Sequence, residues 1–233
     1  PRILAGLTEE AREKAKEFYS TFCDDLVEVS SPEVAEAAKL FENTFRQINI
    51  ALVNEFAQIT NSLGIPVREV LDAASTKPYG FMKFTPGIGV GGHCIPVDPS
   101  YLAYVAEKNG VVPSFINLAN KVNLAMPEYI VNRIEELLGG QLSGKKILIC
   151  GMAYKKDVAD VRESPSALLV RELRSRGATV AWHDPLVQEW CGEKSLDLIE
   201  DGFDLTFIAV KHTNLNLNKA NSTSALIFDT TSS

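Results

Sequence analysis

The longest regular pattern in the sequence is a stripe of apolar side chains spaced three and four residues apart between residues 31 and 63. This spacing places them on one face of a helix, which Ser-Ser-Pro at residues 30–32 would start and Gly64 would end. Such a helix is about 48 Å long, more than one small core needs. We therefore expect it at a two-fold dimer interface. The stripe consists of Val34, Ala38, Phe41, Phe45, Ile48, Leu52, Phe56 and Ile59.

Shorter patterns flank this helix. Residues 2–29 predict an amphipathic helix from Thr8 to Phe22, with Thr8 as N-cap, and a strand over 26–29. That is too little for a domain, so we interpret residues 1–29 as the tail of one whose body is missing. Further helices are predicted over residues 67–75, 100–108 and 114–138.

The pattern changes after Gly139-Gly140, where apolar runs typical of buried strands begin to alternate with a helix. This alternation predicts a parallel sheet of the α/β class. We expect a central all-helical region over residues 30–138 and a Rossmann-like region over 139–233. The predicted strands are 145–150, 179–184, 205–210 and 225–229, with a helix over 164–176.

Composition narrows the class of protein. The chain has 233 residues, of which 45% are hydrophobic and 23% charged, so it can bury a core. Its net charge of −7 argues against a protein that grips nucleic acid by neutralising phosphates. No apolar run reaches the roughly 20 residues that span a bilayer, and Pro1-Arg2 begins no signal peptide. We expect a cytoplasmic protein cut from a longer chain, with neither nucleic-acid nor membrane partners.

Gly87, Gly89 and Gly92 form a literal G-x-G-x-x-G, the pattern of a dinucleotide-binding turn. Such a turn follows a buried strand and opens a helix. Here residues 83–86 make a poor strand, and Pro96 prevents a helix over the residues that follow. The glycines instead predict a loop whose backbone lies against a ligand.

Cys94 follows this loop directly. Asp98 and Pro99 predict a helix start just beyond it, with Asp98 as N-cap, and helix N-termini favour thiolates. Cys94 is therefore a candidate nucleophile, although a lone cysteine is more often a small buried hydrophobe. His93 fits a polar loop contact better than a general base or a metal ligand, and we expect no metal site.

A polar wedge formed by Lys39, Asn43, Arg46 and Asn54 lies opposite the apolar stripe of the long helix. A polar helix face of this kind is normally exposed to solvent. Its two cations and two amides nevertheless suit an anionic or hydroxyl-rich ligand.

In the C-terminal region, the first strand runs into residues 151–156, and residues 160–165 precede a helix. Ligands of open α/β sheets bind at this strand end. Lys155 and Arg162 are candidate phosphate partners there, although the glycine fingerprint is incomplete. Cys150 ends the strand and is most simply a core residue.

Taken together, the helix over residues 36–55, the loop over 87–98 and the segment 151–165 resemble the UDP-glucose/GDP-mannose dehydrogenase family. The resemblance implies a central helical dimerisation domain and a C-terminal UDP-binding domain, without the family's N-terminal NAD-binding domain. It implies an NAD-dependent oxidation of a sugar C6 alcohol to an aldehyde, a cysteine thiohemiacetal, a thioester and finally a uronate.

By this resemblance, Cys94 is the nucleophile and Lys39 the cation that stabilises developing oxyanions. Asn43 positions substrate and water, and Asp98 takes part in proton transfer. Contacts to the UDP-sugar are expected from Lys83, Phe84, Gly87, Gly91, Arg46 and Lys155, and contacts to NAD from Val97 and Arg162.

Residues 91–99 and 76–81 look closest to family members that oxidise UDP-N-acetylhexosamines. This favours UDP-N-acetylglucosamine, then UDP-N-acetylmannosamine, over UDP-glucose.

Two other classes of function compete with a dehydrogenase. The truncated chain could be a non-catalytic dimerisation and UDP-binding module, and a cysteine hydrolase using Cys94 and His93 is disfavoured because adjacent residues seldom orient a base.

Overall fold

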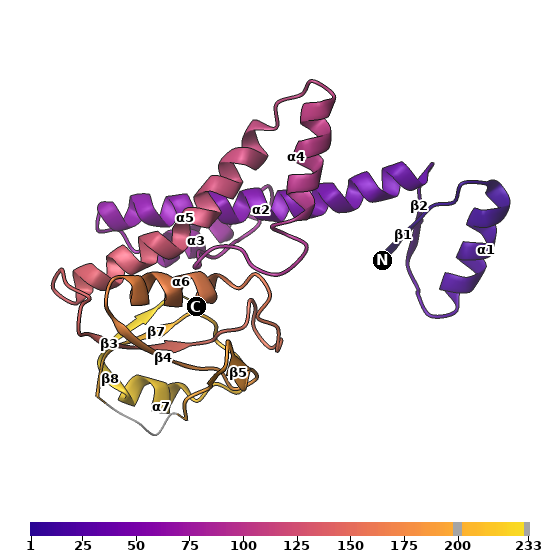
Figure 1. Cartoon of the computed structure of the whole chain (residues 1–233). Helices are drawn as coiled ribbons and strands as arrows, with labels where there is room; N and C mark the ends of the chain where they lie inside the picture. The colour runs from indigo at the N-terminus through magenta and orange to yellow at the C-terminus, as the bar shows by residue number, and fades with distance from the viewer. Residues whose placement is uncertain (198–201, 231–233) are drawn as a thin grey trace.

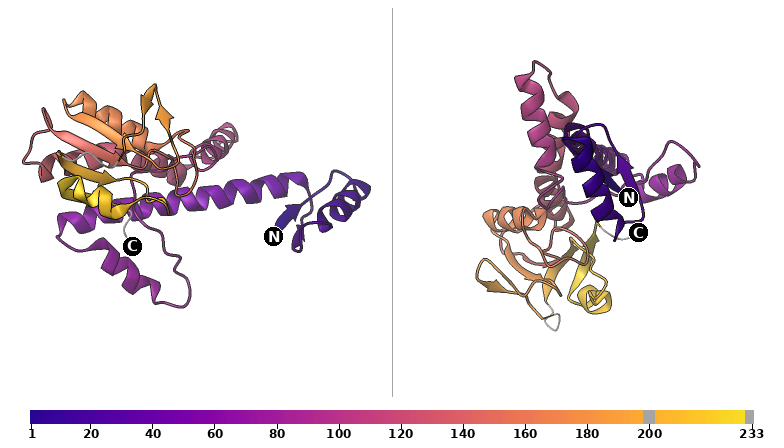
Figure 2. Two further views of the ribbon diagram at one scale, coloured as in Figure 1. Left: turned by 90° about the horizontal axis from the view of Figure 1, so that it is seen from below. Right: turned by 90° about the vertical axis from the view of Figure 1, so that its right-hand side faces the viewer.

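The computed structural model describes residues 1–197 and 202–230. The long helix α2 (Pro32–Ser62) is the axis along which the other parts are arranged (Figure 1). A small unit of two strands and a helix lies at one end of α2, and a sheet lies near its other end (Figure 2).

The N-terminal unit contains β1 (Arg2–Leu4), α1 (Glu9–Ser20) and β2 (Leu26–Glu28), and its two strands pair in parallel. The Thr8 hydroxyl accepts a hydrogen bond from the Ala11 N–H at 3.1 Å, which confirms the predicted N-cap. No residue of α1 is buried. Of residues 1–29 only Leu4 is buried, so this unit has almost no core of its own.

Helix α2 begins as the sequence predicts, because the Ser31 hydroxyl accepts a hydrogen bond from the Val34 N–H at 3.4 Å. Three shorter helices contact it, and two of them, α4 and α5, rise from it as a hairpin (Figure 1). Their bounds lie within two residues of those predicted: α3 is Val67–Ser75, α4 is Asp98–Lys108 and α5 is Ser114–Leu137.

The orientation of α2 differs from the expectation. Phe41 and Leu52 of the apolar stripe are 68% and 63% exposed, whereas Asn43 and Asn54 of the polar wedge are 2% and 0% exposed. A solvent-facing wedge is therefore wrong for both asparagines. The physical reason is that the neighbouring helices offer them polar partners, which offset the cost of burying an amide.

The C-terminal region has the predicted parallel sheet, with strand order β4-β3-β7-β8. Helices α5 and α6 cover one face and α7 covers the other. The sequence analysis missed α7 and a short antiparallel hairpin, β5–β6. The bounds are β3 Lys146–Cys150, α6 Pro165–Ser175, β4 Thr179–His183, β5 Glu189–Trp190, β6 Glu193–Lys194, β7 Phe203–Ile208, α7 Leu217–Ser222 and β8 Ser224–Asp229.

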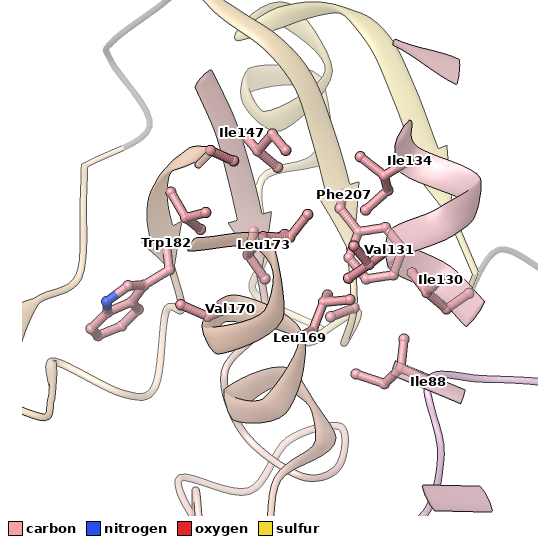
Figure 3. Packing of buried hydrophobic residues seen from close by; sticks show 14 of the residues in the cluster. Ile88, Ile130, Val131, Ile134, Ile147, Leu169, Val170, Leu173, Trp182 and Phe207 are labelled. Carbon is pink, nitrogen blue, oxygen red and sulfur yellow. The ribbon is translucent and has the colours of Figure 1, made fainter. Parts of the chain in front are cut away.

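The main apolar core joins this sheet to the central helices. Ile147, Leu173 and Phe207 are fully buried together with Val131 and Ile134 of α5 (Figure 3). Helix α5 therefore contributes to both regions and connects them.

Cys150 is fully buried at the end of β3, as expected for a core residue. Burial, and secondarily the Asp184 carboxylate, raises the pKa of its thiol to about 12. None of the helices within the described residues is long and apolar enough to cross a membrane.

Candidate functional site

The segment between α3 and α4 ends in a stretch that we call the cysteine loop, residues 86–97. It neither follows a strand nor begins a helix at its glycines, which confirms that the G-x-G-x-x-G pattern is no dinucleotide turn here. A Cβ on Gly91 would lie 2.7 Å from the Pro165 ring, and one on Gly92 would lie 2.7 Å from the Tyr154 ring. Gly91 and Gly92 thus make room for Pro165 and Tyr154, and the expectation that the loop backbone lies against a ligand stays a prediction.

Two contacts fix the beginning of the cysteine loop. The Gly87 N–H donates a hydrogen bond to Asn54 Oδ1 at 2.9 Å, and the Ile88 side chain is buried in the main core (Figure 3). A Cβ at Gly87 would meet nothing within 4 Å, so Gly87 leaves open space beside the loop.

Cys94 is exposed and stands one turn before α4. Its carbonyl accepts hydrogen bonds from the N–H groups of Val97 at 3.2 Å and Asp98 at 2.8 Å. This turn places Cys94 directly before the N-terminus of α4.

The predicted role of Asp98 as N-cap is wrong. Val97 occupies the cap position without a side-chain hydrogen bond, and Asp98 is the first residue of α4. Its carboxylate is engaged elsewhere, because Asp98 Oδ2 accepts a hydrogen bond of 2.6 Å from Asn43 Nδ2 on α2. The crossing of α2 and α4 thus joins two predicted catalytic residues, with Cys94 on the adjoining turn.

Lys39 and Arg46 lie on α2 on either side of Asn43. Lys39 Nζ is 3.1 Å from Glu42 Oε2, and Arg46 bonds the other oxygen of that carboxylate. The hydrogen bond from Lys39, aided by Arg46, holds the pKa of Glu42 below its usual value. Both cations are about half exposed, so they can also reach an anionic ligand.

Lys83 and Phe84 precede the cysteine loop and both contact the protein. The Lys83 ammonium pairs with the Asp72 carboxylate of α3. The Phe84 ring packs edge-on against Phe45 of α2, with centroids 6.0 Å apart. These contacts place both residues against the helical region.

A cavity of about 580 Å³ opens at the carboxyl ends of β3 and β7. Because β4 lies beyond β3 and β8 beyond β7, the strand order reverses between β3 and β7, where open α/β sheets bind ligands. Lys155 is there as predicted, and the sequence analysis missed Lys211. The cavity is lined by Tyr154, Lys155, Lys156, Ala209, Val210, Lys211, His212, Thr213, Leu215 and Leu217.

Buried polar groups hold the loops around this cavity. The Asp184 carboxylate accepts hydrogen bonds from the N–H groups of residues 152 and 153 at 2.7 and 3.0 Å, and contacts His212 Nε2 at 3.2 Å. His212 Nδ1 accepts from the Asp157 N–H, so the proton of this ring lies on Nε2. Two hydrogen bonds from Thr213 hold the pKa of the Asp157 carboxylate below its usual value.

The two residues expected to contact NAD lie in different places. Arg162, on the loop before α6, is 70% exposed, and its guanidinium donates 3.0 and 2.7 Å hydrogen bonds to Asp160 Oδ2. Val97 lines a concavity of about 430 Å³ beside the Cys94 turn, together with Tyr101 and Tyr104. Arg162 does not line the concavity that Val97 lines.

Residues 1–197 and 202–230 contain no group of three or more His, Cys, Asp or Glu side chains that could hold a metal ion.

Two segments match domains of one protein family. Residues 33–125 match the central domain of the UDP-glucose/GDP-mannose dehydrogenase family, and residues 148–232 match its UDP-binding domain. Both segments carry the motifs on which the sequence resemblance rests.

Individual proteins agree with this match. The chain is 36% identical over 213 residues to UDP-N-acetyl-D-mannosamine dehydrogenase of Methanocaldococcus jannaschii, covering 91% of this chain and 48% of that protein. It is 38% identical to UDP-N-acetyl-D-glucosamine 6-dehydrogenase of Pseudomonas aeruginosa, covering 80% and 44%. The structure of UDP-D-ManNAc dehydrogenase from Pyrococcus horikoshii matches with a TM-score of 0.83 and 32% identity, covering 98% of this chain and 55% of that one. The chain thus spans about half the length of these relatives.

Proposed function

Because the chain belongs to the UDP-glucose/GDP-mannose dehydrogenase family, we propose that it is the catalytic and nucleotide-binding part of an NAD-dependent UDP-sugar 6-dehydrogenase. The observation that carries this proposal is the junction of α2 and α4, where Asn43 donates to Asp98 beside the Cys94 turn. In this proposal residues 30–138 form the central domain and residues 139–233 the UDP-binding domain. Residues 1–29 are the end of an NAD-binding domain.

Cys94 acts as the nucleophile. Its thiolate adds to the carbonyl carbon of the aldehyde formed in the first oxidation, and the oxygen takes up a proton to give a thiohemiacetal. The second oxidation leaves a thioester, whose C–S bond breaks when water adds, releasing the acid and the thiolate. Overall, one alcohol, two NAD⁺ and one water give one carboxylate, two NADH and three protons.

The polar residues around Cys94 support these steps. Lys39 stabilises negative charge on the reacting oxygen in both oxidations. Asp98 accepts and returns protons. Asn43 holds the Asp98 carboxylate in place and orients water. Arg46 contributes a second exposed cation on the same helix.

The cavity at the ends of β3 and β7 receives the UDP group. Lys155, Lys156 and Lys211 supply positive charge for a diphosphate, in a chain whose net charge is −7. The sugar then extends toward the cysteine loop, past Lys83, Phe84, Gly87 and Gly91.

When bound, NAD⁺ accepts a hydride in each oxidation. The described residues fit the cofactor as one wall of its site. The concavity beside Val97 is partly aromatic and suits a flat ring, and the exposed Arg162 guanidinium suits a phosphate. The rest of the site belongs to the domain that residues 1–29 complete.

The substrate we propose is a UDP-N-acetylhexosamine. The Pseudomonas relative is named for UDP-N-acetyl-D-glucosamine and the Methanocaldococcus relative for UDP-N-acetyl-D-mannosamine. Residues 76–81 and 91–99 favour the glucosamine epimer first.

The outward apolar face of α2 supports a homodimer. Phe41, Phe45, Leu52 and Ile59 remain exposed along a helix about 46 Å long. Stable interfaces bury large apolar surfaces of this kind, and a two-fold axis pairs one such stripe with its copy.

The proposal is tested by co-expressing the chain with an NAD-binding domain of the family. The purified assembly is offered UDP-N-acetylglucosamine, UDP-N-acetylmannosamine and UDP-glucose while NADH absorbance is followed. We expect two NADH per sugar, fastest with UDP-N-acetylglucosamine. The chain alone should bind UDP but form no NADH, as in the non-catalytic alternative. NADH formation by the chain alone, or none from the assembly with any UDP-sugar, would contradict the proposal.

A further inference from the structure

The cysteine loop and the first residue of α4 are tied to one face of helix α2. At one end Asn54 accepts from the Gly87 N–H, and at the other Asn43 donates to Asp98. Asn43 and Asn54 are eleven residues apart, which is about three turns and roughly 20° from the same direction. Residues 87–98, which include Cys94, are therefore attached to α2 at both ends by two buried asparagines.

The bond to Gly87 is the last link of a buried chain of hydrogen bonds. Asn123 Nδ2 on α5 donates to the Gln47 carbonyl at 3.2 Å, and Asn54 Nδ2 donates to Asn123 Oδ1 at 3.1 Å. Asn54 Oδ1 then accepts from the Gly87 N–H at 2.9 Å. Asn54 is 0% exposed and Asn123 6% exposed, so water cannot replace these partners freely.

The direction of this chain is fixed by its two ends. The Gln47 carbonyl can only accept and the Gly87 N–H can only donate, so each intervening amide has one possible orientation. Turning either amide over would bring two donors or two acceptors together in a buried site.

Asn123 also limits where the loop can lie. Its backbone carbonyl would be 2.8 Å from a Cβ on Gly89, a residue with φ of 120°. Ile88, between the two contact points, is buried in the same apolar cluster as Met126 and Ile130 of α5. The loop therefore lies against α5 at Ile88 and Gly89.

We propose that Asn54 and Asn123 are positioning residues that set the placement of Cys94 by fixing the start of the cysteine loop. This inference rests on the proposed role of Cys94 as the nucleophile. A thiolate acts only at a defined distance from its electrophile, so a loosened loop impairs the capture of the aldehyde more than its formation. Freed aldehyde then leaves before the second oxidation.

The first test measures hydrogen exchange of the cysteine loop in the whole chain by mass spectrometry, with the α6 peptide as an internal reference. Asn54→Leu and Asn123→Leu should each accelerate exchange in the loop at least about tenfold, with α6 unchanged. The double variant should do no more than either single variant, because all three break the same chain. Thr60→Val is the matched control, since among the residues that the structure describes the buried Thr60 hydroxyl bonds only carbonyls of its own helix, those of Phe56 and Ala57.

A third variant, Asn54→Asp, separates loss of the hydrogen bond from misfolding. In its protonated form the new carboxyl group has the same donor and acceptor as the amide, whereas the carboxylate lacks the donor to Asn123. Loop exchange, corrected for its intrinsic pH dependence, should therefore be native at low pH and accelerated at high pH. Loop protection equal to that of the unmodified chain in all variants, or equal loss in Thr60→Val, would overturn the proposal.

The second readout is the product ratio in the assembly with an NAD-binding domain. Asn54→Leu and Asn123→Leu should raise the share of aldehyde among products several-fold, whereas mere loss of folded enzyme would lower aldehyde and acid together. An unchanged ratio would overturn the positioning role. If the unmodified assembly makes no NADH, the proposed function fails, and the exchange data still decide whether the two asparagines fix the loop.

Discussion

Helix α2 and the C-terminal sheet bury different kinds of side chain. In the sheet region, Ile147, Leu173 and Phe207 are fully buried, and charged groups lie around a cavity at its edge. In the helical region, α2 buries Asn43 and Asn54 and exposes Phe41 and Leu52. The sheet region can stabilise itself by removing apolar surface from water. In our proposal, the helical region uses its buried amides to hold the cysteine loop and leaves its exposed apolar surface for a partner subunit.

The largest expected effect on stability lies in the sheet region. Phe207→Ala removes a fully buried ring that packs against Phe228 with centroids 5.3 Å apart, and should lower the free energy of unfolding by about 3–5 kcal/mol. Phe41→Ala on α2 should cost less than about 1 kcal/mol in the monomer, because that ring is exposed. Urea titrations monitored by circular dichroism compare the two. Equal losses in the free energy of unfolding would contradict the difference between the two regions.

The second effect concerns assembly. Leu52→Glu places a charge in the proposed dimer interface twice, once from each copy, and should raise the dimer dissociation constant at least about 100-fold. Leu168→Glu, which alters an exposed leucine of α6, should leave it unchanged. Sedimentation velocity over a concentration series measures both constants. A monomer at every concentration before mutation would contradict the dimer.

The third effect concerns nucleotide binding. Lys155→Ala should weaken UDP binding about tenfold or more, because a charge-assisted hydrogen bond contributes roughly 1.5–3 kcal/mol. Lys121→Ala, on the exposed side of α5, removes the same charge outside the cavity and should change the affinity little. Isothermal titration calorimetry with UDP gives both values. Equal weakening by the two variants would mean that UDP binds elsewhere or by net charge alone.

The smallest effect concerns an ion pair at the edge of the sheet region. Arg174 bonds both oxygens of Glu193 at 2.7 Å, and this hydrogen bonding holds the pKa of Glu193 below its usual value. A lowered pKa means that the contribution is present above the unfolded-state pKa and is lost as the pH falls through the folded-state pKa. Both side chains are more than a third exposed, so Glu193→Gln should cost less than about 1 kcal/mol at pH 7, and the cost should shrink as the pH falls toward 3.

Glu189→Gln on the facing strand serves as the control for this ion pair, since it removes a like charge from the same hairpin. Thermal unfolding at both pH values measures the difference between the two variants. A Glu193→Gln effect that is as large at pH 3 as at pH 7 would contradict the assignment.

Local signals predicted the elements well. Helix α2 begins and ends within one residue of the predicted 31–63, because its cap, its proline and its apolar spacing all lie within the segment. The four parallel strands were equally readable from their apolar runs. The orientation of α2 could not be predicted in this way, because periodicity groups side chains on a face of a helix without showing what covers that face.

The missed parts of the site depend on residues far apart in the sequence. Asp98 has a typical capping sequence, yet Asn43, 55 residues away, takes its carboxylate. Asn123 carries no motif, and its role follows only from α5 packing on α2. The signal available for His212 was its place shortly after the buried strand β7, just as Asp184 directly follows β4. Parallel strands bring such residues together at one edge of the sheet.

The most direct test of the account is mass spectrometry of Cys94 during turnover. The assembly of this chain with an NAD-binding domain is mixed with UDP-N-acetylglucosamine and NAD⁺, quenched in acid and digested. We predict a sugar acyl adduct on the Cys94 peptide and none on the peptide of the exposed Cys191. Cys94→Ser should lower acid formation at least about 100-fold and release aldehyde, because a serine hydroxyl is the poorer nucleophile. Normal conversion of alcohol to acid by Cys94→Ser, without any adduct in the unmodified protein, would contradict the central claim.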